Sequence, residues 1–283
     1  MSPDESNLKN KTNLIQLSFE NTTAHLFKNN IFDGKILLIK DSKEILKIIK
    51  LTEQYFNYIF NTRITYSEKL KINCNKENSI FFEIIQNRIK FCKLIRKHFA
   101  NFLLQIELGI QSTFMDYITF RYSPASGMKN IGTLIPTPAH RDTWASNIFN
   151  QINFWFPTHN VSDRNSIFFV PKYFKKSVSN NSDEWSFYQY KKTKKFLSTP
   201  VSNIKFPKNQ TVSFNVKKGE VLCFSGHQIH GSLVGESNRL NLETRIVCEN
   251  DEEAYKIPVN LDAMGTVRRN NWFKNLTTGK SYI

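Results

Sequence analysis

The pattern of apolar and polar positions divides the chain into a helical first third and a strand-rich remainder. Residues 41–60 repeat apolar side chains three or four positions apart, the period of an amphipathic helix. Asp41 and Glu44 stand three residues apart, the spacing of a capping box at its start. Residues 79–104 repeat the same pattern over a longer span, so we expect a second, longer helix there.

After Gly109 the pattern changes to short runs rich in Phe, Ile, Val and Thr, separated by Pro, Gly, Asn and Ser. Such runs are typical of strands. The runs expected to form strands are 114–123, 146–157, 165–171, 210–226 and 239–249. Because no helical segments alternate with these runs, they favour an antiparallel sandwich or jelly roll over a doubly wound sheet.

The domain organisation follows from this change of pattern. With 283 residues and 40% hydrophobic content, the chain can bury a full core. We expect a single domain over residues 1–283, with a mainly helical N-terminal region (1–110), a jelly-roll core (111–250) and a C-terminal extension (251–283).

The composition bears on the cellular location of the protein and on the state of its cysteines. The polar start lacks the features of a secretory signal, and no run approaches the ~20 apolar residues of a membrane span, so we expect a cytoplasmic protein that does not enter membranes. The four cysteines, at 74, 92, 223 and 248, form no C-x-x-C pair and are expected to be reduced thiols.

The formal net charge of +15 indicates an anionic partner, which could be nucleic acid, anionic lipid or a substrate with carboxylates or phosphates. Charge alone does not choose among them. The short run Lys191–Lys195 is expected to be a solvated loop.

One constellation of residues carries chemistry. His140 and Asp142 in "HRD" are two positions apart, so their side chains share a face of an extended chain. His230 follows a predicted strand ninety residues later. Two imidazoles and one carboxylate form a facial triad, which holds Fe(II) and leaves three positions for a chelating co-substrate and O2.

The return strand supplies cations for such a co-substrate. Arg239, Asn241, Glu243 and Arg245 alternate along it and so share a face. 2-Oxoglutarate would need a bidentate cation for its distal carboxylate, which Arg239 or Arg245 could provide.

From Phe114 to Cys248 the sequence resembles the Fe(II)/2-oxoglutarate-dependent oxygenases, specifically the phytanoyl-CoA hydroxylase-like group. The resemblance is carried by "HRDTW" from His140, "QINFWFPTHNVSDRNSIFFVPKYF" from Gln151 and "HQIHGS" with "NRLNLETR" from His227.

This resemblance implies a fold, a site and a reaction. The fold is mainly β with α, a double-stranded β-helix (jelly roll, cupin-like) core with an N-terminal helical layer. The metal ligands map to His140, Asp142 and His230, and the 2-oxoglutarate arginine maps to Arg239, with Arg245 as the alternative. The other residues expected beside the co-substrate are Ser232 and Asn153.

The implied reaction is oxidation of a C–H bond by O2, coupled to decarboxylation of 2-oxoglutarate. Because halogenating relatives replace the metal-binding carboxylate with a small residue, Asp142 favours hydroxylation, desaturation or oxidative ring closure. The expected substrate is a small, anionic metabolite in secondary or carbohydrate metabolism, including natural-product biosynthesis. The sequence does not indicate the oligomeric state.

Four further residues are candidates for substrate contact. Arg121 could clamp an anion, although an ion pair is the commoner fate of a lone arginine. Trp144, Gln151 and Trp155 could line the pocket, although core packing explains the tryptophans as well.

Three other functions fit parts of the pattern. A zinc hydrolase could use the same ligands, but it would leave the arginine pair unexplained and needs a general base that the sequence does not reveal. "RLNLETR" also resembles a run in oxygenases that demethylate nucleic acids, but no basic stripe with stacking aromatics accompanies it. The third alternative is a non-catalytic anion-binding β-sandwich.

Overall fold

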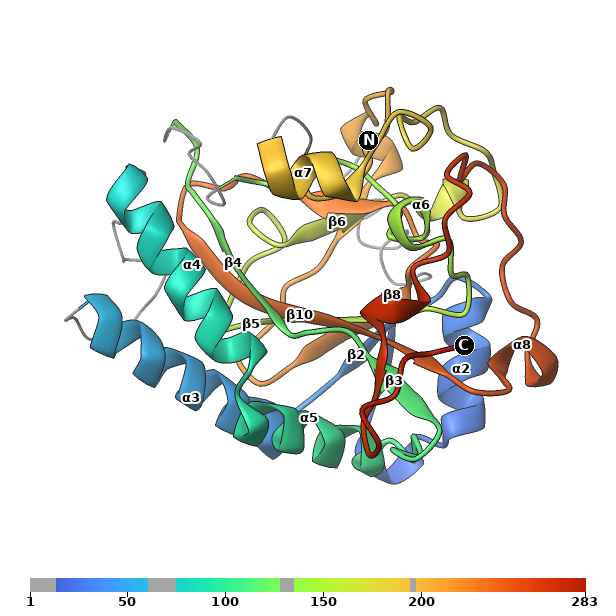
Figure 1. Ribbon diagram of the computed structural model, residues 1–283, viewed down its shortest axis with the longest axis horizontal. Helices are drawn as coiled ribbons and strands as arrows, with labels where there is room; N and C mark the ends of the chain where they lie inside the picture. Colours follow the sequence, from blue (N-terminus) through green and yellow to red (C-terminus); the bar gives the residue numbers. More distant parts are fainter. Residues whose placement is uncertain (1–13, 61–74, 128–134, 194–196) are drawn as a thin grey trace.

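Two β-sheets face each other at the centre of the computed structural model, which describes residues 14–60, 75–127, 135–193 and 197–283 (Figure 1). The strands of the large sheet, in spatial order, are β1 (Leu14–Leu17), β2 (Ile36–Ile39), β8 (Val221–Ser225), β5 (Ile152–Pro157), β10 (Arg239–Cys248), β3 (Thr113–Met115) and β11 (Lys274–Asn275). The small sheet has the order β7 (Val212–Ser213), β6 (Ile167–Phe169) and β9 (His230–Ser232).

The order of the strands along the chain identifies the fold. β4 (Thr119–Ser123) pairs with β10 in the large sheet, and His140 then joins the small sheet through an antiparallel bridge to His230. The chain continues with β5 in the large sheet, β6 and β7 in the small one, β8 in the large, β9 in the small and β10 in the large. This repeated crossing between two facing sheets is a double-stranded β-helix, and it confirms the predicted jelly-roll core.

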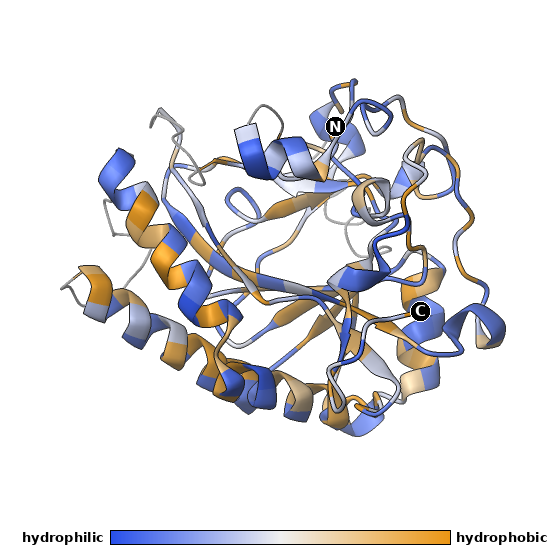
Figure 2. Cartoon of the chain, in the orientation of Figure 1, coloured by the Kyte–Doolittle hydropathy of each residue, from blue (hydrophilic) through white to orange (hydrophobic). Residues whose placement is uncertain are grey.

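Helices cover the outer face of the large sheet. This layer consists of α2 (Ala24–Phe32), α3 (Lys43–Phe60), α4 (Lys76–Lys90) and α5 (Lys93–Gln105). The short helices outside the layer are α6 (Thr143–Ser146), α7 (Phe187–Thr193) and α8 (Asp251–Ala254). The long helices lie along one side in Figure 1, and Figure 2 shows that each carries both hydrophobic and hydrophilic residues. The predicted helical layer is therefore confirmed. None of the helices in the described ranges is long and apolar enough to cross a membrane.

The alternation of side chains along β10 separates the core from a cavity. Leu240, Leu242 and Ile246 are buried against the helical layer in the main hydrophobic core. Arg239, Asn241, Glu243 and Arg245 point to the opposite face and line a cavity between the sheets. The same period of two applies to β5, where Phe154 faces the helices and Trp155 faces the small sheet.

The N-terminal region differs from its prediction in its edge strands and in the division of one helix. It adds β1 and β2 to the edge of the large sheet, and these two strands are parallel to each other. The helix expected over residues 79–104 is divided into α4 and α5, because Cys92 takes an extended backbone conformation with φ −75° and ψ 107°. The bend keeps Ile89 of α4 and Phe99 of α5 in one core.

The start of α3 is not capped as predicted. Asp41 has a positive φ of 55°, and Ser42 accepts the hydrogen bond from the backbone N–H of Ile45 at 3.2 Å. The Glu44 carboxylate instead binds Lys47 at 2.5 Å and His98 at 2.7 Å.

The described cysteines, 92, 223 and 248, are free thiols, and Cys74 lies outside the described residues. The C-terminal extension shares the large sheet with the core through β11 and β3. The division of the chain at residues 110 and 250 remains a prediction.

Candidate metal centre

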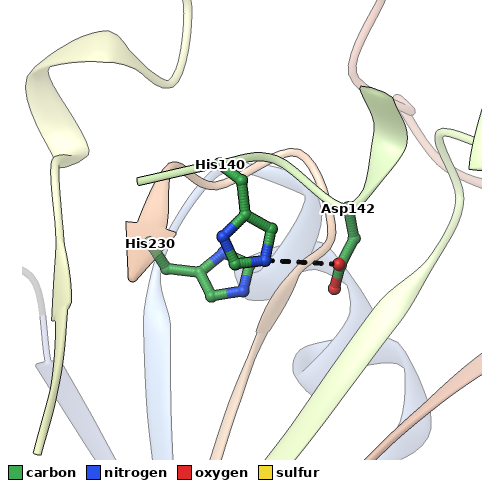
Figure 3. Close-up of side chains that lie close together, drawn as sticks. All are labelled: His140, Asp142 and His230. Carbon is green, nitrogen blue, oxygen red and sulfur yellow. Dashed lines mark ion pairs between the residues drawn. The ribbon is translucent and has the colours of Figure 1, made fainter. Parts of the chain in front are cut away.

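Three side chains converge where the two sheets meet at the mouth of the jelly roll. Figure 3 shows His140, Asp142 and His230 pointing toward one another. One potential ligand atom from each lies within 4.8 Å of the others. Reciprocal backbone hydrogen bonds of 2.9 and 3.0 Å join His140 to His230, so the small sheet itself sets the distance between the two imidazoles.

The hydrogen bonds of both histidines leave the same ring nitrogen available. Nδ1 of His140 lies 2.8 Å from the carbonyl oxygen of Pro138, and Nδ1 of His230 lies 2.9 Å from that of Gln228. Because a carbonyl oxygen only accepts, each Nδ1 must carry the proton. Each Nε2 then presents its lone pair, which is how metal-binding histidines are usually oriented.

The protonation states also suit a metal. Burial, together with the nearby His140, lowers the pKa of His230 to about 3, so the ring is neutral at neutral pH. Burial alone would raise the pKa of Asp142, but the contact with His140 and the charge of Arg245 hold it well below the usual range. A neutral imidazole and an ionised carboxylate are the forms that bind metal ions.

A short chain of amides orients the carboxylate. Asn153 Nδ2 donates to Asp142 Oδ2 at 2.6 Å, and Gln151 Nε2 donates to Asn153 Oδ1 at 2.8 Å. Gln151 packs against the backbone of Gly226, where an added Cβ would lie 2.4 Å from Gln151 Nε2. Gln151 therefore acts behind Asn153, and not on the cavity wall where it was predicted.

The triad opens into a cavity of about 580 Å³ between the sheets. The wall includes Asn153, Trp155, Ser232, Arg239, Arg245 and Arg121 among the residues predicted from the sequence. It also includes side chains from α4, from α7 and from the C-terminal extension. The volume is within the range of roughly 300–1,000 Å³ that is common for small-molecule sites.

Arg239 is a buried cation without an acidic partner. It is 2% exposed, and the described residues place no carboxylate within salt-bridge distance of it. Its Nη1 donates to the carbonyl oxygen of Asn165 at 2.9 Å, and its Nη2 to Ser232 Oγ at 3.0 Å. The Trp155 ring lies beneath the guanidinium, with its centroid 5.6 Å from Arg239 Cζ. Burial lowers the pKa of Arg239 to about 10, so it stays charged at neutral pH.

Arg245 occupies a different environment, next to the triad. It forms an ion pair with Asp116, and its Nη1 lies 3.8 Å from Asp142 Oδ1. Asp116 follows β3, where a three-residue break separates β3 from β4 along the edge of β10. Trp272 of the C-terminal extension covers the guanidinium at 5.1 Å.

Two of the predicted substrate contacts have other partners. The Arg121 guanidinium is paired with Glu243, so the ion-pair alternative describes it better than the anion clamp. Trp144 does not line the cavity. It follows Asp142 at the start of α6, which directs the ring into a separate cluster with Val170 and Ile229.

Sequence reasoning missed several residues of the cavity wall. Asp116 lies inside a predicted strand, and nothing in the pattern marked the break that brings it to Arg245. Trp272 lies in the extension, where no spacing connected it to the triad. Lys90 of α4 and Lys191 of α7 also line the cavity, each beside aromatic rings.

Comparison with known proteins gives only distant matches. No protein-family model and no curated protein sequence match the chain. Among solved structures, EvdO2 from Micromonospora carbonacea var. aurantiaca, complexed with 2-oxoglutarate, is similar with a TM-score of 0.45 and 7% identity over 78% of this chain and 89% of that one.

Two other solved structures are similar at the same level. The epimerase SnoN, in complex with Fe3+, alpha ketoglutarate and nogalamycin RO, gives a TM-score of 0.42 and 10% identity over 84% of this chain and 93% of that one. The non-heme monooxygenase ThoJ gives a TM-score of 0.39 and 10% identity over 72% and 69%. At such low similarity, the function of this chain has to be inferred from its own side chains.

Proposed function

We propose that the protein is an Fe(II)- and 2-oxoglutarate-dependent oxygenase of the phytanoyl-CoA hydroxylase-like kind, which oxidises a C–H bond of a small anionic metabolite. The observation that carries this proposal is Arg239, a buried guanidinium that faces the same cavity as the triad and has no carboxylate partner among the described residues. A desolvated charge of this kind is costly unless an anion pairs with it. The distal carboxylate of 2-oxoglutarate is such an anion.

The triad fits Fe(II) in its donor set. One potential ligand atom from each of the two imidazoles and the carboxylate lies within 4.8 Å of the others, and all three side chains line the cavity. Two imidazoles and one carboxylate with open positions are typical of non-haem Fe(II) oxygenases. Bound there, iron would supply the activation of O2 that C–H oxidation requires.

The two arginines of β10 would have separate roles. Arg245 is already paired with Asp116, and its Nη1 lies 3.8 Å from Asp142 Oδ1, directly beside the residues that would hold the metal, so it is poorly placed for the far end of a chelating five-carbon acid. Arg239 is separated from Arg245 by six positions along the strand, and Ser232 beside it offers a hydroxyl. We therefore assign the co-substrate carboxylate to Arg239 and Ser232, and the positioning of Asp142 to Asn153 and Arg245.

The wall of the cavity argues against a zinc hydrolase. Such an enzyme would need a carboxylate or histidine near the metal as a general base. The nearby carboxylates Asp116 and Glu243 are each held in an ion pair, with Arg245 and Arg121 respectively, so neither is directed at the triad as a free base.

The substrate would occupy the part of the cavity away from Arg239. Lys90 lies 4.1 Å from the Tyr117 ring, and Lys191 lies beside Tyr190 at 5.6 Å. Neither lysine has a salt-bridge partner among the described residues, so these ammonium groups, and not Arg121, are our candidates for an anionic group of the substrate. We propose that the reaction belongs to natural-product biosynthesis and takes place in the cytoplasm.

Slow turnover of the co-substrate tests this proposal without knowledge of the substrate. Purified protein with Fe(II), ascorbate and 2-oxoglutarate in air should release succinate, and His140→Ala should release none. Far-ultraviolet circular dichroism would verify that the variant is folded. Succinate release that is equal in both proteins would contradict the assignment of the triad.

A further inference from the structure

Arg141, the residue between the first two ligands, connects the ligand-bearing segments inside the protein. Its side chain is fully buried. Nη1 donates to the carbonyl oxygen of His227, in the loop that leads to His230. Nη2 donates to the carbonyl oxygens of Tyr173 at 2.8 Å and Lys176 at 2.7 Å. One guanidinium thus joins the turn at residues 140–142 to the loop that carries the third ligand.

The counter-ion of Arg141 comes from the C-terminal extension. Arg141 Nε donates to Asp262 Oδ2 at 3.2 Å, and the Asp262 side chain is only 3% exposed. The same carboxylate accepts from Trp144 Nε1 at 2.7 Å through Oδ1 and from the backbone N–H of Val178 at 2.9 Å through Oδ2. Asp262 therefore binds residues 141 and 144, on either side of Asp142.

We propose that Asp262 is a positioning residue for the metal centre, acting through Arg141 and Trp144. It makes no contact with the metal ligands themselves, but it fixes the turn that carries His140 and Asp142 against the loop that carries His230. The extension would thus complete the site, because the described residues of the jelly-roll core place no carboxylate within salt-bridge distance of Arg141. The inference rests on the proposed metal site, and not on the co-substrate or substrate.

Replacing Asp262 with Asn removes the charge at almost unchanged volume. The two oxygens of Asp262 face three donors, Trp144 Nε1, Arg141 Nε and the Val178 N–H. An asparagine must turn its NH2 group toward at least one of them, so at least one of these donors loses its acceptor. An unpaired buried donor is destabilising, more so next to a charge, and the turn should shift to relieve it.

A second buried carboxylate of the extension gives a matched control. Asp251 is 2% exposed and binds Lys28 Nζ at 2.6 Å, away from the cavity. Asp251→Asn should destabilise the fold as Asp262→Asn does, but without touching the turn. A purely structural role for Asp262 predicts that the two variants behave alike.

The experiment titrates Co(II), without 2-oxoglutarate, into wild type, Asp262→Asn and Asp251→Asn, following the visible Co(II) spectrum. Hydrogen exchange of the backbone amides in residues 140–147 is measured on the metal-free proteins. We expect Asp262→Asn to weaken Co(II) affinity about tenfold, the lower end of the effect of losing a direct outer partner of a metal ligand, because Asp262 acts through Arg141 and Trp144. It should also speed exchange in that segment, while Asp251→Asn changes neither.

Equal Co(II) affinity and equal exchange in the two variants would overturn the proposal. If Asp262→Asn does not fold, Arg141→Lys replaces it, because three lysine donors cannot serve the four acceptors of Arg141, and the same two outcomes apply. If wild type binds no Co(II), the proposed metal function fails, and the exchange result alone decides whether Asp262 positions the turn.

Discussion

Arg239→Lys should separate co-substrate binding from metal binding. The substitution keeps the positive charge but replaces the rigid, planar guanidinium with a flexible ammonium group. Nε and Nη1 of Arg239 are directed to Asn241 and to backbone carbonyl oxygens, whereas Nη2 contacts only Ser232 among the described residues. The side of the guanidinium that carries Nη2 is therefore the one that can receive an anion.

The size of the effect follows from the hydrogen bonds at stake. A lysine would lose one or two charge-assisted hydrogen bonds to the carboxylate, each contributing roughly 1.5–3 kcal/mol. Because the lysine ammonium keeps part of the attraction to the carboxylate, we expect a net loss of about 2–4 kcal/mol, which corresponds to a Kd for 2-oxoglutarate raised about 30- to 700-fold.

Isothermal titration of 2-oxoglutarate into Ni(II)-loaded protein measures this Kd, and titration of Ni(II) alone measures the triad. Arg239→Lys should leave Ni(II) affinity unchanged. The matched control is Arg245→Lys, because Arg245 is already paired with Asp116 and should not determine 2-oxoglutarate affinity. A larger loss of 2-oxoglutarate affinity in Arg245→Lys than in Arg239→Lys would refute the separate roles of the two arginines.

Three further substitutions test the surroundings of the site and the helical layer. Gly226→Ala should weaken Ni(II) binding and lower stability by roughly 1–3 kcal/mol, because the new Cβ displaces Gln151 and the amide chain behind Asp142; a variant with unchanged Ni(II) affinity would show that this chain is dispensable. Burial lowers the pKa of His227 to about 3 from 6.5, so its folded form stays neutral and its contribution to stability is lost as pH falls below 6.5. Between pH 7 and pH 5, the free energy of unfolding measured with urea should fall by about 2 kcal/mol more in wild type than in His227→Phe. An equal fall in the two proteins would contradict the buried, neutral ring. Burial would raise the pKa of Glu44, but its hydrogen bonds to Lys47 and His98 lower it to about 2. The ionised Glu44 therefore stabilises the fold fully above pH 4.5, and this stabilisation is lost as pH falls through 2. Glu44→Gln should therefore be less stable than wild type at pH 7 by roughly 1–3 kcal/mol, and the two unfolding curves should converge near pH 2.

Strand parity was the part of the sequence that translated most directly into structure. Arg239, Asn241, Glu243 and Arg245 were expected on one face because they alternate, and they all line the cavity. The alternation of side chains requires only an extended backbone, so it does not depend on which strands lie next to the segment. Strand pairing places His140 beside His230, but Asp142 lies at the start of α6 with helical backbone angles (φ −67°, ψ −27°), so the extended spacing expected for His140 and Asp142 does not explain its position.

Features that depend on a change of direction could not be predicted. The break after β3 turns Asp116 toward Arg245, and α6 turns Trp144 away from the cavity. The bend at Cys92 likewise leaves the apolar period of the helices intact. In each case a few backbone angles decide the outcome, and the hydrophobic pattern does not record them.

Contacts between distant segments were also invisible in the sequence. Arg141 and Asp262 are 121 positions apart, and "HRD" drew attention only to its outer residues. A buried arginine can be satisfied by backbone carbonyl oxygens anywhere along the chain, so no spacing identifies its partners. The same applies to the pairing of Arg121 with Glu243 across neighbouring strands.

The most direct test of the metal and co-substrate site is an anaerobic titration of wild type with Fe(II) and 2-oxoglutarate, followed in the visible spectrum. We expect the weak metal-to-ligand charge-transfer band of an iron-bound keto acid to appear in wild type and to be absent in His140→Ala. Folded, iron-loaded wild type that shows no band would contradict the oxygenase assignment, and it would favour a zinc hydrolase or an anion-binding protein instead.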